Sequence, residues 1–256
     1  MISGATAVSV RQKPQVIPRL AARSSKGVEE ALSLLGVKAE PRMFPPGQGI
    51  ISEGRRSNSL FILVEGIAIS YRILRDAQRQ VLGIIIPGDF AGSPSCFFKS
   101  ALYSVRALTP VAAVVVPLTA LVALLDTQPR AAAELWWALS CETAIYAKRL
   151  ISVSRRPAIE RVAHFLLELF TRLDKVGLTE HHSYRLPVTQ EILSDALGLS
   201  IPYVNRVLQQ LRAEGLVRIK GQEVVIENME ELAILAGFEQ TYLTPLSLAD
   251  FTTKPA

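Results

Sequence analysis

The chain has 256 residues, 49% of them hydrophobic, and carries 28 Lys and Arg against 23 Asp and Glu. This length allows one large domain or two ordinary ones, and no apolar run reaches the roughly eighteen residues of a membrane helix. Two cysteines, Cys96 and Cys141, exclude a disulfide framework and a four-cysteine metal site. The composition is typical of a reducing compartment, so we expect a cytoplasmic protein without a membrane association.

The positive charge is concentrated at the start of the chain, where residues 1–27 hold five basic residues and no acidic one. The remaining chain carries equal numbers of the two signs. We predict that residues 1–34 form a basic, disordered tail and a short helix. The tail also has the composition of a transit peptide, which is the alternative, but it lacks the apolar core of a secretory signal.

Residues 35–126 are predicted to form an antiparallel, jelly-roll-like β-roll. Short runs of β-branched residues recur about every ten residues and are separated by glycines, which is typical of antiparallel sandwiches and rolls. The clearest runs are 50–54, 60–66, 67–74 and 80–86. A short helix is predicted directly after them, over 117–125.

Residues 127–156 are predicted to form one long helix, from about Pro129 to Ser154, with the proline in its first turn. Residues spaced alternately four and three apart make a heptad seam along it. These residues are Ala132, Trp136, Leu139, Thr143, Tyr146, Leu150 and Val153. A seam of this length favours a dimer of two such helices, and an amphipathic helix packed on its own domain is the alternative.

Residues 157–228 are predicted to form a winged helix-turn-helix preceded by an amphipathic helix over 158–173. Thr189 is placed to cap a first helix over 190–197, and Gly198-Leu199-Ser200 makes a tight turn. A second helix is expected from about Ile201 to Glu214. Two short strands around Gly221-Gln222 then predict a hairpin wing. Residues 229–256 are predicted to be a final helix and a tail.

The second of these helices has two different faces. Val204, Val207, Leu208 and Leu211 are predicted to face inward, and the opposite face is polar. An arginine can donate two hydrogen bonds from its guanidinium group to one guanine, and an asparagine or glutamine can form two hydrogen bonds with an adenine. Residues near helix starts commonly hold phosphate. The candidate DNA-binding residues are Thr189, Gln190, Ser200, Pro202, Tyr203, Asn205, Arg206 and Gln209.

This domain is not basic overall, because residues 157–228 hold eight Lys and Arg against nine Asp and Glu. DNA binding would therefore require the positive charges to gather on one face. An ordinary solvated helix face is the alternative reading of the second helix.

The order of roll, long helix and winged helix-turn-helix resembles the CRP/FNR family of bacterial transcription regulators, over roughly residues 35–240. The segments 49–54, 60–66 and 86–92 are similar to the opening turn, central strand and pocket loop of the family's sensor domain. Segments 196–200 and 204–217 resemble its helix-turn-helix signature. The resemblance implies an α+β fold and a homodimer that binds double-stranded DNA at a pseudo-palindrome and contacts RNA polymerase.

The resemblance also places an effector pocket in the roll, but this sequence departs from the family's pattern for cyclic nucleotides. Ser93 stands where the ribose-binding glutamate belongs, and Ala101 and Leu102 stand where an Arg-Ser pair holds the phosphate. Because a buried phosphate needs a charged partner, we expect no cyclic AMP binding. The candidate pocket residues are Gly88, Asp89, Phe90, Gly92, Ser93 and Arg106, with Arg106 the one cation nearby.

Other cofactors fit the sequence no better, so we expect neither a cofactor nor a metal. An iron–sulfur cluster of the family's other branch needs four cysteines. A haem in the sensor domain needs an axial ligand there, but the three histidines all lie after residue 163.

The second helix of the helix-turn-helix, which reads the DNA in this family, begins with Ile201 and Pro202. The best-known members carry a glutamate and often another charged residue at these positions. The resemblance therefore leaves the effector and the operator sequence open.

No pattern of an enzyme is present, since the chain lacks a nucleophile elbow, a zinc-protease motif and a phosphate loop. The function that the sequence favours is a sequence-specific, DNA-binding transcription regulator. The alternative is a small-ligand sensor that acts through a protein partner instead of DNA.

Overall fold

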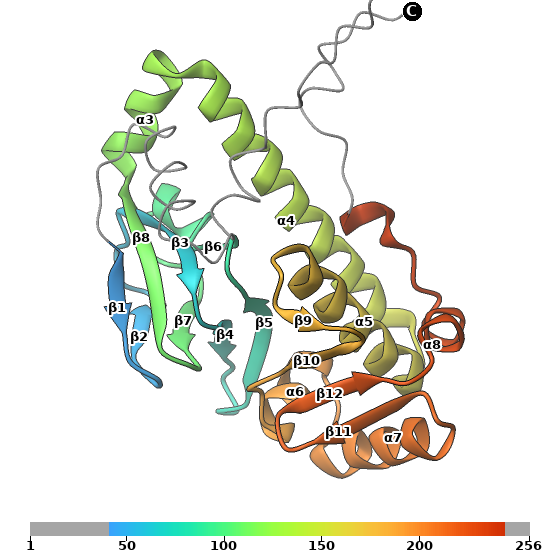
Figure 1. Ribbon diagram of the computed structural model, residues 1–256. Helices are drawn as coiled ribbons and strands as arrows, with labels where there is room; N and C mark the ends of the chain where they lie inside the picture. The colour runs from blue at the N-terminus through green and yellow to red at the C-terminus, as the bar shows by residue number, and fades with distance from the viewer. Residues whose placement is uncertain (1–40, 244–256) are drawn as a thin grey trace, which may run out of the picture.

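The computed structural model describes residues 41–243 (Figure 1). The predicted tail over 1–34 and residues 244–256 lie outside the described residues. The described chain forms three antiparallel, four-stranded sheets and a series of helices. The predicted α+β class, with an N-terminal roll, a long helix and a C-terminal helix-turn-helix, is confirmed.

Two facing sheets form the N-terminal roll. One has the strand order β1-β8-β3-β6 and the other β2-β7-β4-β5. Phe44, Phe61, Leu63, Ile85 and Val105 are buried in the core between them. The strands are β1 (Arg42–Phe44), β2 (Gly49–Ile51), β3 (Ser59–Glu65), β4 (Ala68–Ile73), β5 (Arg79–Ile85), β6 (Phe90–Ala91), β7 (Ser104–Ala107) and β8 (Val111–Pro117). The four predicted runs correspond to β2, β3, β4 and β5.

Two helices cover the outer face of the β1-β8-β3-β6 sheet. A 3-10 turn, η1 (Ser95–Phe97), precedes β7, and β8 leads into α3 (Leu118–Thr127) and α4 (Pro129–Arg155). Leu60 and Val116 of the sheet pack with Leu121 of α3 and Ala138 of α4. Helix α4 then runs diagonally from the end of the roll to the C-terminal domain (Figure 1).

The C-terminal domain is built around α5 (Ala158–Lys175), on which α7 (Ile201–Ala213) and α8 (Met229–Ala236) pack. Helix α5 is amphipathic, and Val162, Leu166 and Leu169 on its inner face are fully buried. The other elements are β9 (Thr179–Glu180), β10 (Ser183–Arg185), α6 (Gln190–Leu197), β11 (Val217–Lys220), β12 (Glu223–Ile226) and η2 (Gln240–Leu243).

The roll and the C-terminal domain share one apolar core. Ile69, Val81 and Ile84, on the outer face of the β2-β7-β4-β5 sheet, belong to the same buried cluster as Leu166 and Leu193 of the C-terminal domain. Burying a side chain of this size stabilises the folded chain by about 1.5–3 kcal/mol. The sheet therefore fixes where the helix-turn-helix lies. Over residues 41–243, no helix is both long and apolar enough to cross a bilayer.

Candidate nucleic-acid interface and interdomain junction

The helix-turn-helix has the boundaries that its capping residues predict. The side chain of Thr189 accepts a hydrogen bond from the backbone N–H of Ile192, at 3.2 Å, and so caps α6. Gly198 ends α6 in the left-handed region, with φ of 62°, where glycine has no steric cost. Helix α7 then begins at Ile201 after Ser200 and ends at Ala213, one residue earlier than expected.

Helix α7 presents one apolar and one polar face. Val204, Val207 and Leu211 are buried, whereas Arg206 and Gln209 are exposed. The guanidinium carbon of Arg206 lies 5.8 Å from the centre of the Tyr203 ring, and this cation–π contact helps to hold the arginine in place. Pro202 and Tyr203 are also exposed, and Asn205 is half-buried. The polar face is therefore available to a DNA groove.

The candidate phosphate-binding residues lie at the starts of α6 and α7. Gln190 and Ser200 are exposed, and Thr189 is exposed apart from its capping bond. The N–H groups of a helix's first turn have no partner within the helix and favour an anion. The first turns of α6 and α7 are therefore the candidate phosphate-binding positions.

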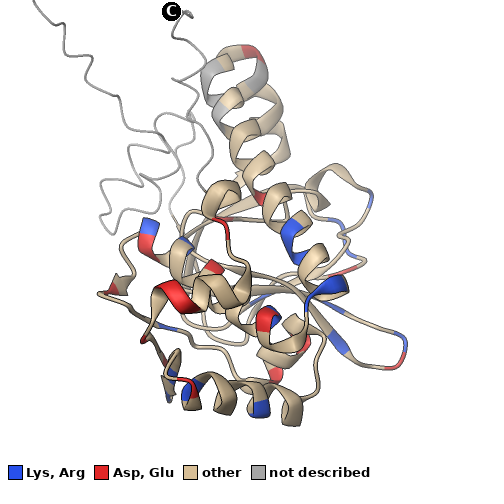
Figure 2. Cartoon of the chain, turned by 90° about the vertical axis from the view of Figure 1, so that its right-hand side faces the viewer, with Lys and Arg blue, Asp and Glu red and all other residues tan. Residues whose placement is uncertain are grey.

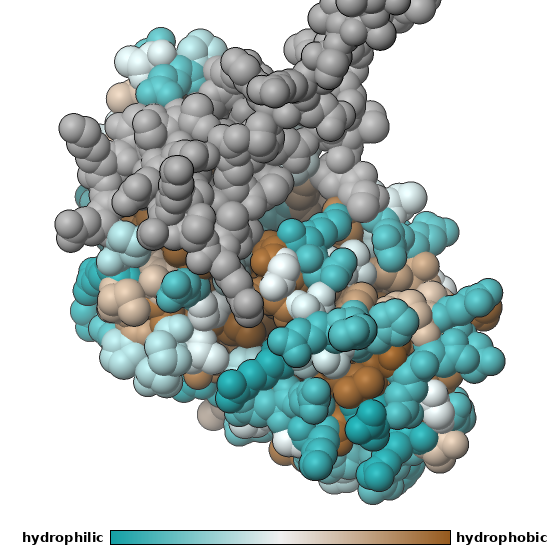
Figure 3. Space-filling view, viewed as in Figure 1, coloured by the Kyte–Doolittle hydropathy of each residue, from teal (hydrophilic) through white to brown (hydrophobic). Residues whose placement is uncertain are grey.

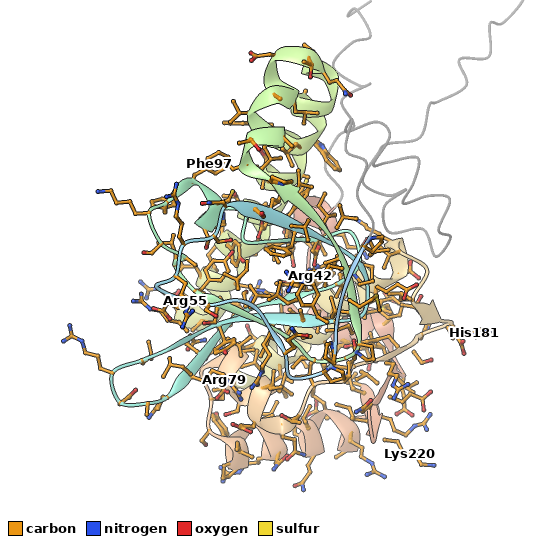
Figure 4. The ribbon with its side chains drawn as sticks, turned by 90° about the vertical axis from the view of Figure 1, so that its left-hand side faces the viewer. Arg42, Arg55, Arg79, Phe97, His181 and Lys220 are labelled. Atoms are coloured by element: carbon orange, nitrogen blue, oxygen red, sulfur yellow. The ribbon has the colours of Figure 1, made fainter. Side chains whose placement is uncertain are left out.

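The wing is larger than the predicted hairpin. Strands β11 and β12 turn at Gly221-Gln222 as expected, but β12 also pairs with β10, and β10 with β9. His181 and His182 lie in the β9–β10 turn and are exposed. In Figure 4, His181 and Lys220 project outward on the same side of the molecule. Basic (blue) and acidic (red) positions are interspersed along the ribbon of the C-terminal domain (Figure 2), in agreement with its nearly neutral composition.

The predicted seam of α4 lies largely open in the single chain. Trp136 is 74% exposed and Leu150 71% exposed, and the neighbouring Ile151 and Val153 are also exposed. Tyr146 and Thr143 are exposed at their positions on the seam, whereas Ala132 and Leu139 are half-buried. Exposure of large apolar side chains in one row is unusual for a surface that faces water.

A buried charge cluster joins α4, α5 and the roll. Glu168 of α5 is 1% exposed, and its carboxylate accepts from Arg149 of α4 at 2.8 Å and from Arg172 at 3.4 Å. Arg172 also bonds Asp89 of the roll and the backbone oxygen of Ile84. Burial alone would raise the pKa of Glu168, but the two arginines hold it below its usual range.

A second polar contact joins the roll directly to the helix-turn-helix. Arg79, the first residue of β5, bonds Asp195 at 2.7 Å and Glu191 at 3.0 Å, both on α6. The side-chain amide of Gln80 donates to the backbone oxygen of Asp195 at 2.7 Å. Figure 4 shows Arg79 where the roll meets the helices of the C-terminal domain. A shift of α6 would therefore break bonds to β5.

The structure separates the predicted effector-pocket residues into two groups. Gly88, Asp89 and Phe90 line a cavity between the roll, α4 and α5. Gly92 packs against Ile51, the hydroxyl of Ser93 donates to Glu142 at 2.8 Å, and Arg106 lies 5.6 Å over the ring of Tyr71. None of these last three lines the cavity.

The comparisons with known proteins agree with this architecture. Residues 41–128 match the model of the cyclic nucleotide-binding domain, and residues 160–235 match the model of the Crp-like helix-turn-helix domain. The transcriptional activator protein anr of Pseudomonas aeruginosa is 26% identical, over 91% of this chain and 98% of the relative. The electron transport regulator A of Shewanella oneidensis is 27% identical, over 75% and 76%.

Among solved structures, FixK2 from Bradyrhizobium japonicum superposes with a TM-score of 0.70 and 26% identity, over 78% of this chain and 98% of that chain. The chain belongs to the CRP/FNR family of transcription regulators. The Pseudomonas relative is named a transcriptional activator, and the family is one of transcription regulators instead of enzymes. Helices α6 and α7 are the helix-turn-helix of its DNA-binding domain.

Sequence reasoning missed the charge cluster of this CRP/FNR protein. Glu168 and Arg172 lie four residues apart on α5 and are both buried, so they fall on the same inner side as Val162 and Leu169. A charged pair at apolar positions of an amphipathic helix was the available signal, because such residues are rarely buried unless paired. Their partners, Asp89 and Arg149, are distant in sequence and could not have been named from it.

Glu142 should make the stability of this CRP/FNR protein depend on pH. Burial raises its pKa from 4.5 to about 7, with Ser93, Asp89, Tyr146 and Arg172 nearby. The folded chain therefore binds this proton more tightly than the unfolded chain. Its stabilising effect is full below about pH 4.5 and is lost as the pH rises through 7.

We expect Glu142→Gln, which keeps the neutral form, to gain stability relative to the wild type between pH 5 and pH 8. Urea unfolding at both pH values measures the difference, and Glu239→Gln, at an exposed glutamate, is the matched control. A difference that stays constant or shrinks with rising pH would contradict the assignment.

Proposed function

We propose that the protein acts as a homodimer that binds a pseudo-palindromic operator through α7. The exposed polar face of α7, with Arg206 supported by Tyr203, is the observation that carries this proposal. The two copies of α7 would enter successive major grooves about 34 Å apart. Thr189, Gln190 and Ser200 would hold phosphate, and Pro202, Tyr203, Asn205, Arg206 and Gln209 would face the bases. Bound at a promoter, the dimer would contact RNA polymerase.

The alternative, a sensor that acts through a protein partner, predicts no specific DNA binding. Selection from a random library of double-stranded DNA with the purified protein separates the two. An enriched sequence with two inverted half-sites supports the operator proposal, whereas the absence of enrichment supports the alternative. The neutral charge of the domain makes low salt the appropriate condition, because phosphate contacts weaken as salt rises.

Arg206→Ala should weaken binding to the selected operator by about 1–3 kcal/mol, or roughly 5- to 150-fold, because the bidentate hydrogen bonds from the guanidinium group to a base are lost. Fluorescence anisotropy at fixed salt measures the change. Arg55→Ala removes the same charge from an exposed position in the roll and should leave the affinity unchanged. Equal affinities of wild type and Arg206→Ala would refute the role of this residue.

The dimer is proposed to form along α4, through Trp136, Leu139, Thr143, Tyr146, Leu150 and Val153. Leu150→Lys should give monomers with much weaker operator binding, because it places a charge in an apolar seam. Ile234→Lys is the matched control, since Ile234 is 74% exposed but lies on α8. Light scattering at micromolar concentration is the measurement, and a monomeric wild type would contradict the proposal.

We also propose that operator binding does not require cyclic AMP. Ser93, at the ribose-binding position, already bonds Glu142, and Ala101, at the phosphate-binding position, is buried. A buried phosphate without a cationic partner costs several kcal/mol. Calorimetric titration with cyclic AMP should therefore show no saturable heat. A low-micromolar dissociation constant, with tighter operator binding in its presence, would overturn this part.

A further inference from the structure

The first turn of α7 exposes three consecutive apolar side chains. Ile201 is 40% exposed and Tyr203 43% exposed, and Pro202 between them is also exposed. The other exposed side chains of α7 are polar or charged, except the small Ala213 at its end. The surface that the C-terminal domain shows in Figure 3 is mostly hydrophilic. A single exposed apolar residue needs no explanation, but a contiguous group can mark an interaction surface.

Tyr203 already has a partner within the protein, because its ring holds the guanidinium group of Arg206 at 5.8 Å. Ile201 and Pro202 therefore supply the apolar surface that α7 offers to a ligand. Both residues are stiff, since a β-branched side chain has few rotamers and the proline ring fixes its own backbone φ angle. Such a surface loses little conformational freedom when it binds.

Helix geometry places this apolar pair next to the polar face of α7. Residues four apart lie on the same side of a helix, so Pro202 lies one turn before Arg206, and Ile201 lies one turn before Asn205. The N-terminal residues of a recognition helix are those that meet base edges. One helical turn advances about 5.4 Å, and base pairs are about 3.4 Å apart. With Arg206 on a guanine, the apolar pair would lie within about two base pairs of it.

The edges of the four bases present one apolar group in the major groove, the C5 methyl of thymine. The other groups are hydrogen-bond donors and acceptors, which an apolar side chain would bury without a partner. The amino group of cytosine is recognised by a carboxylate, and α7 has no acidic residue from Ile201 to Ala213. Thymine is therefore the base whose chemistry fits the first turn of α7.

We propose that Ile201 and Pro202 contact the methyl group of a thymine in each half-site, and that this contact helps to determine the operator sequence. The inference rests on the proposed function, in which α7 enters the major groove. It adds Ile201 to the base-contacting residues and gives Pro202 a defined partner. Each half-site would combine a guanine bound by Arg206 with a thymine within about two base pairs of it.

Deoxyuridine tests this contact, because it pairs with adenine as thymine does and lacks only the methyl group. The operator selected with the full chain is resynthesised with one thymine position at a time replaced in both half-sites, and fluorescence anisotropy at fixed salt measures the affinity. We expect at least one position at which the replacement weakens wild-type binding fivefold or more, since burying a single methyl group contributes about fourfold. If no thymine of the half-site is sensitive, the inference is wrong.

The double variant Ile201→Ala, Pro202→Ala tests whether these two side chains make the contact. Alanine is a good helix former at both positions, and circular dichroism checks that the variant is folded. We expect its deoxyuridine effect to fall below twofold. Ile234→Ala, at an exposed position on α8, should keep the full effect. An undiminished effect in the double variant would overturn the assignment.

Pro202→Glu should alter the selected sequence, because a carboxylate can accept from the amino group of cytosine. We expect selection with this variant to favour a cytosine at or next to the deoxyuridine-sensitive position, and an unchanged preference for thymine would overturn the role of Pro202. The outcomes separate two failures. If the wild type selects no DNA sequence, the proposed function fails and this inference fails with it. If an operator is selected but deoxyuridine has no effect, this inference alone fails.

Discussion

The pairing of Glu168 with Arg149 and Arg172 is the constraint on which the rest of this structure depends. Glu168 is almost fully buried, and a buried carboxylate is tolerated only with cations and hydrogen bonds around it. Removing one partner of such a pair typically costs about 3–5 kcal/mol. Because the arginines also bond Leu82, Ile84 and Asp89, satisfying this one carboxylate fixes α4, α5 and the roll together.

The close approach of α4 to the roll depends on a small residue in β5. A Cβ at Gly83 would lie 3.0 Å from the Ser70 hydroxyl and 3.2 Å from Nη1 of Arg149. These distances are tighter than ordinary contacts, so with a larger residue here Ser70 or Arg149 would have to move by a few tenths of an ångström. The glycine thus permits the arginine to reach both the β5 backbone and Glu168. Strand β5 therefore determines both where the Arg149 side chain lies and that it can pair with Glu168.

The helix-turn-helix could be predicted because it depends on local interactions, whereas pairing between residues distant in sequence could not be predicted. Thr189, Gly198 and Gly221 act on their immediate neighbours, so the sequence around them specifies where α6, α7 and the wing begin and end. Strands β9 and β10 escaped prediction because they are only two and three residues long, and they are defined by pairing, β10 with β12 and β9 with β10. Likewise, Tyr242 and Arg149 meet one cavity only after the chain folds.

The bonds from Arg79 and Gln80 to α6 have a consequence for how the two halves of the molecule communicate. They connect the strand that borders the cavity to the first helix of the DNA-binding motif. A coupling free energy of this kind is reciprocal. If occupancy in the roll alters the affinity for DNA by some factor, DNA alters the affinity for that occupant by the same factor. The operator itself would then act as an effector of the distant domain.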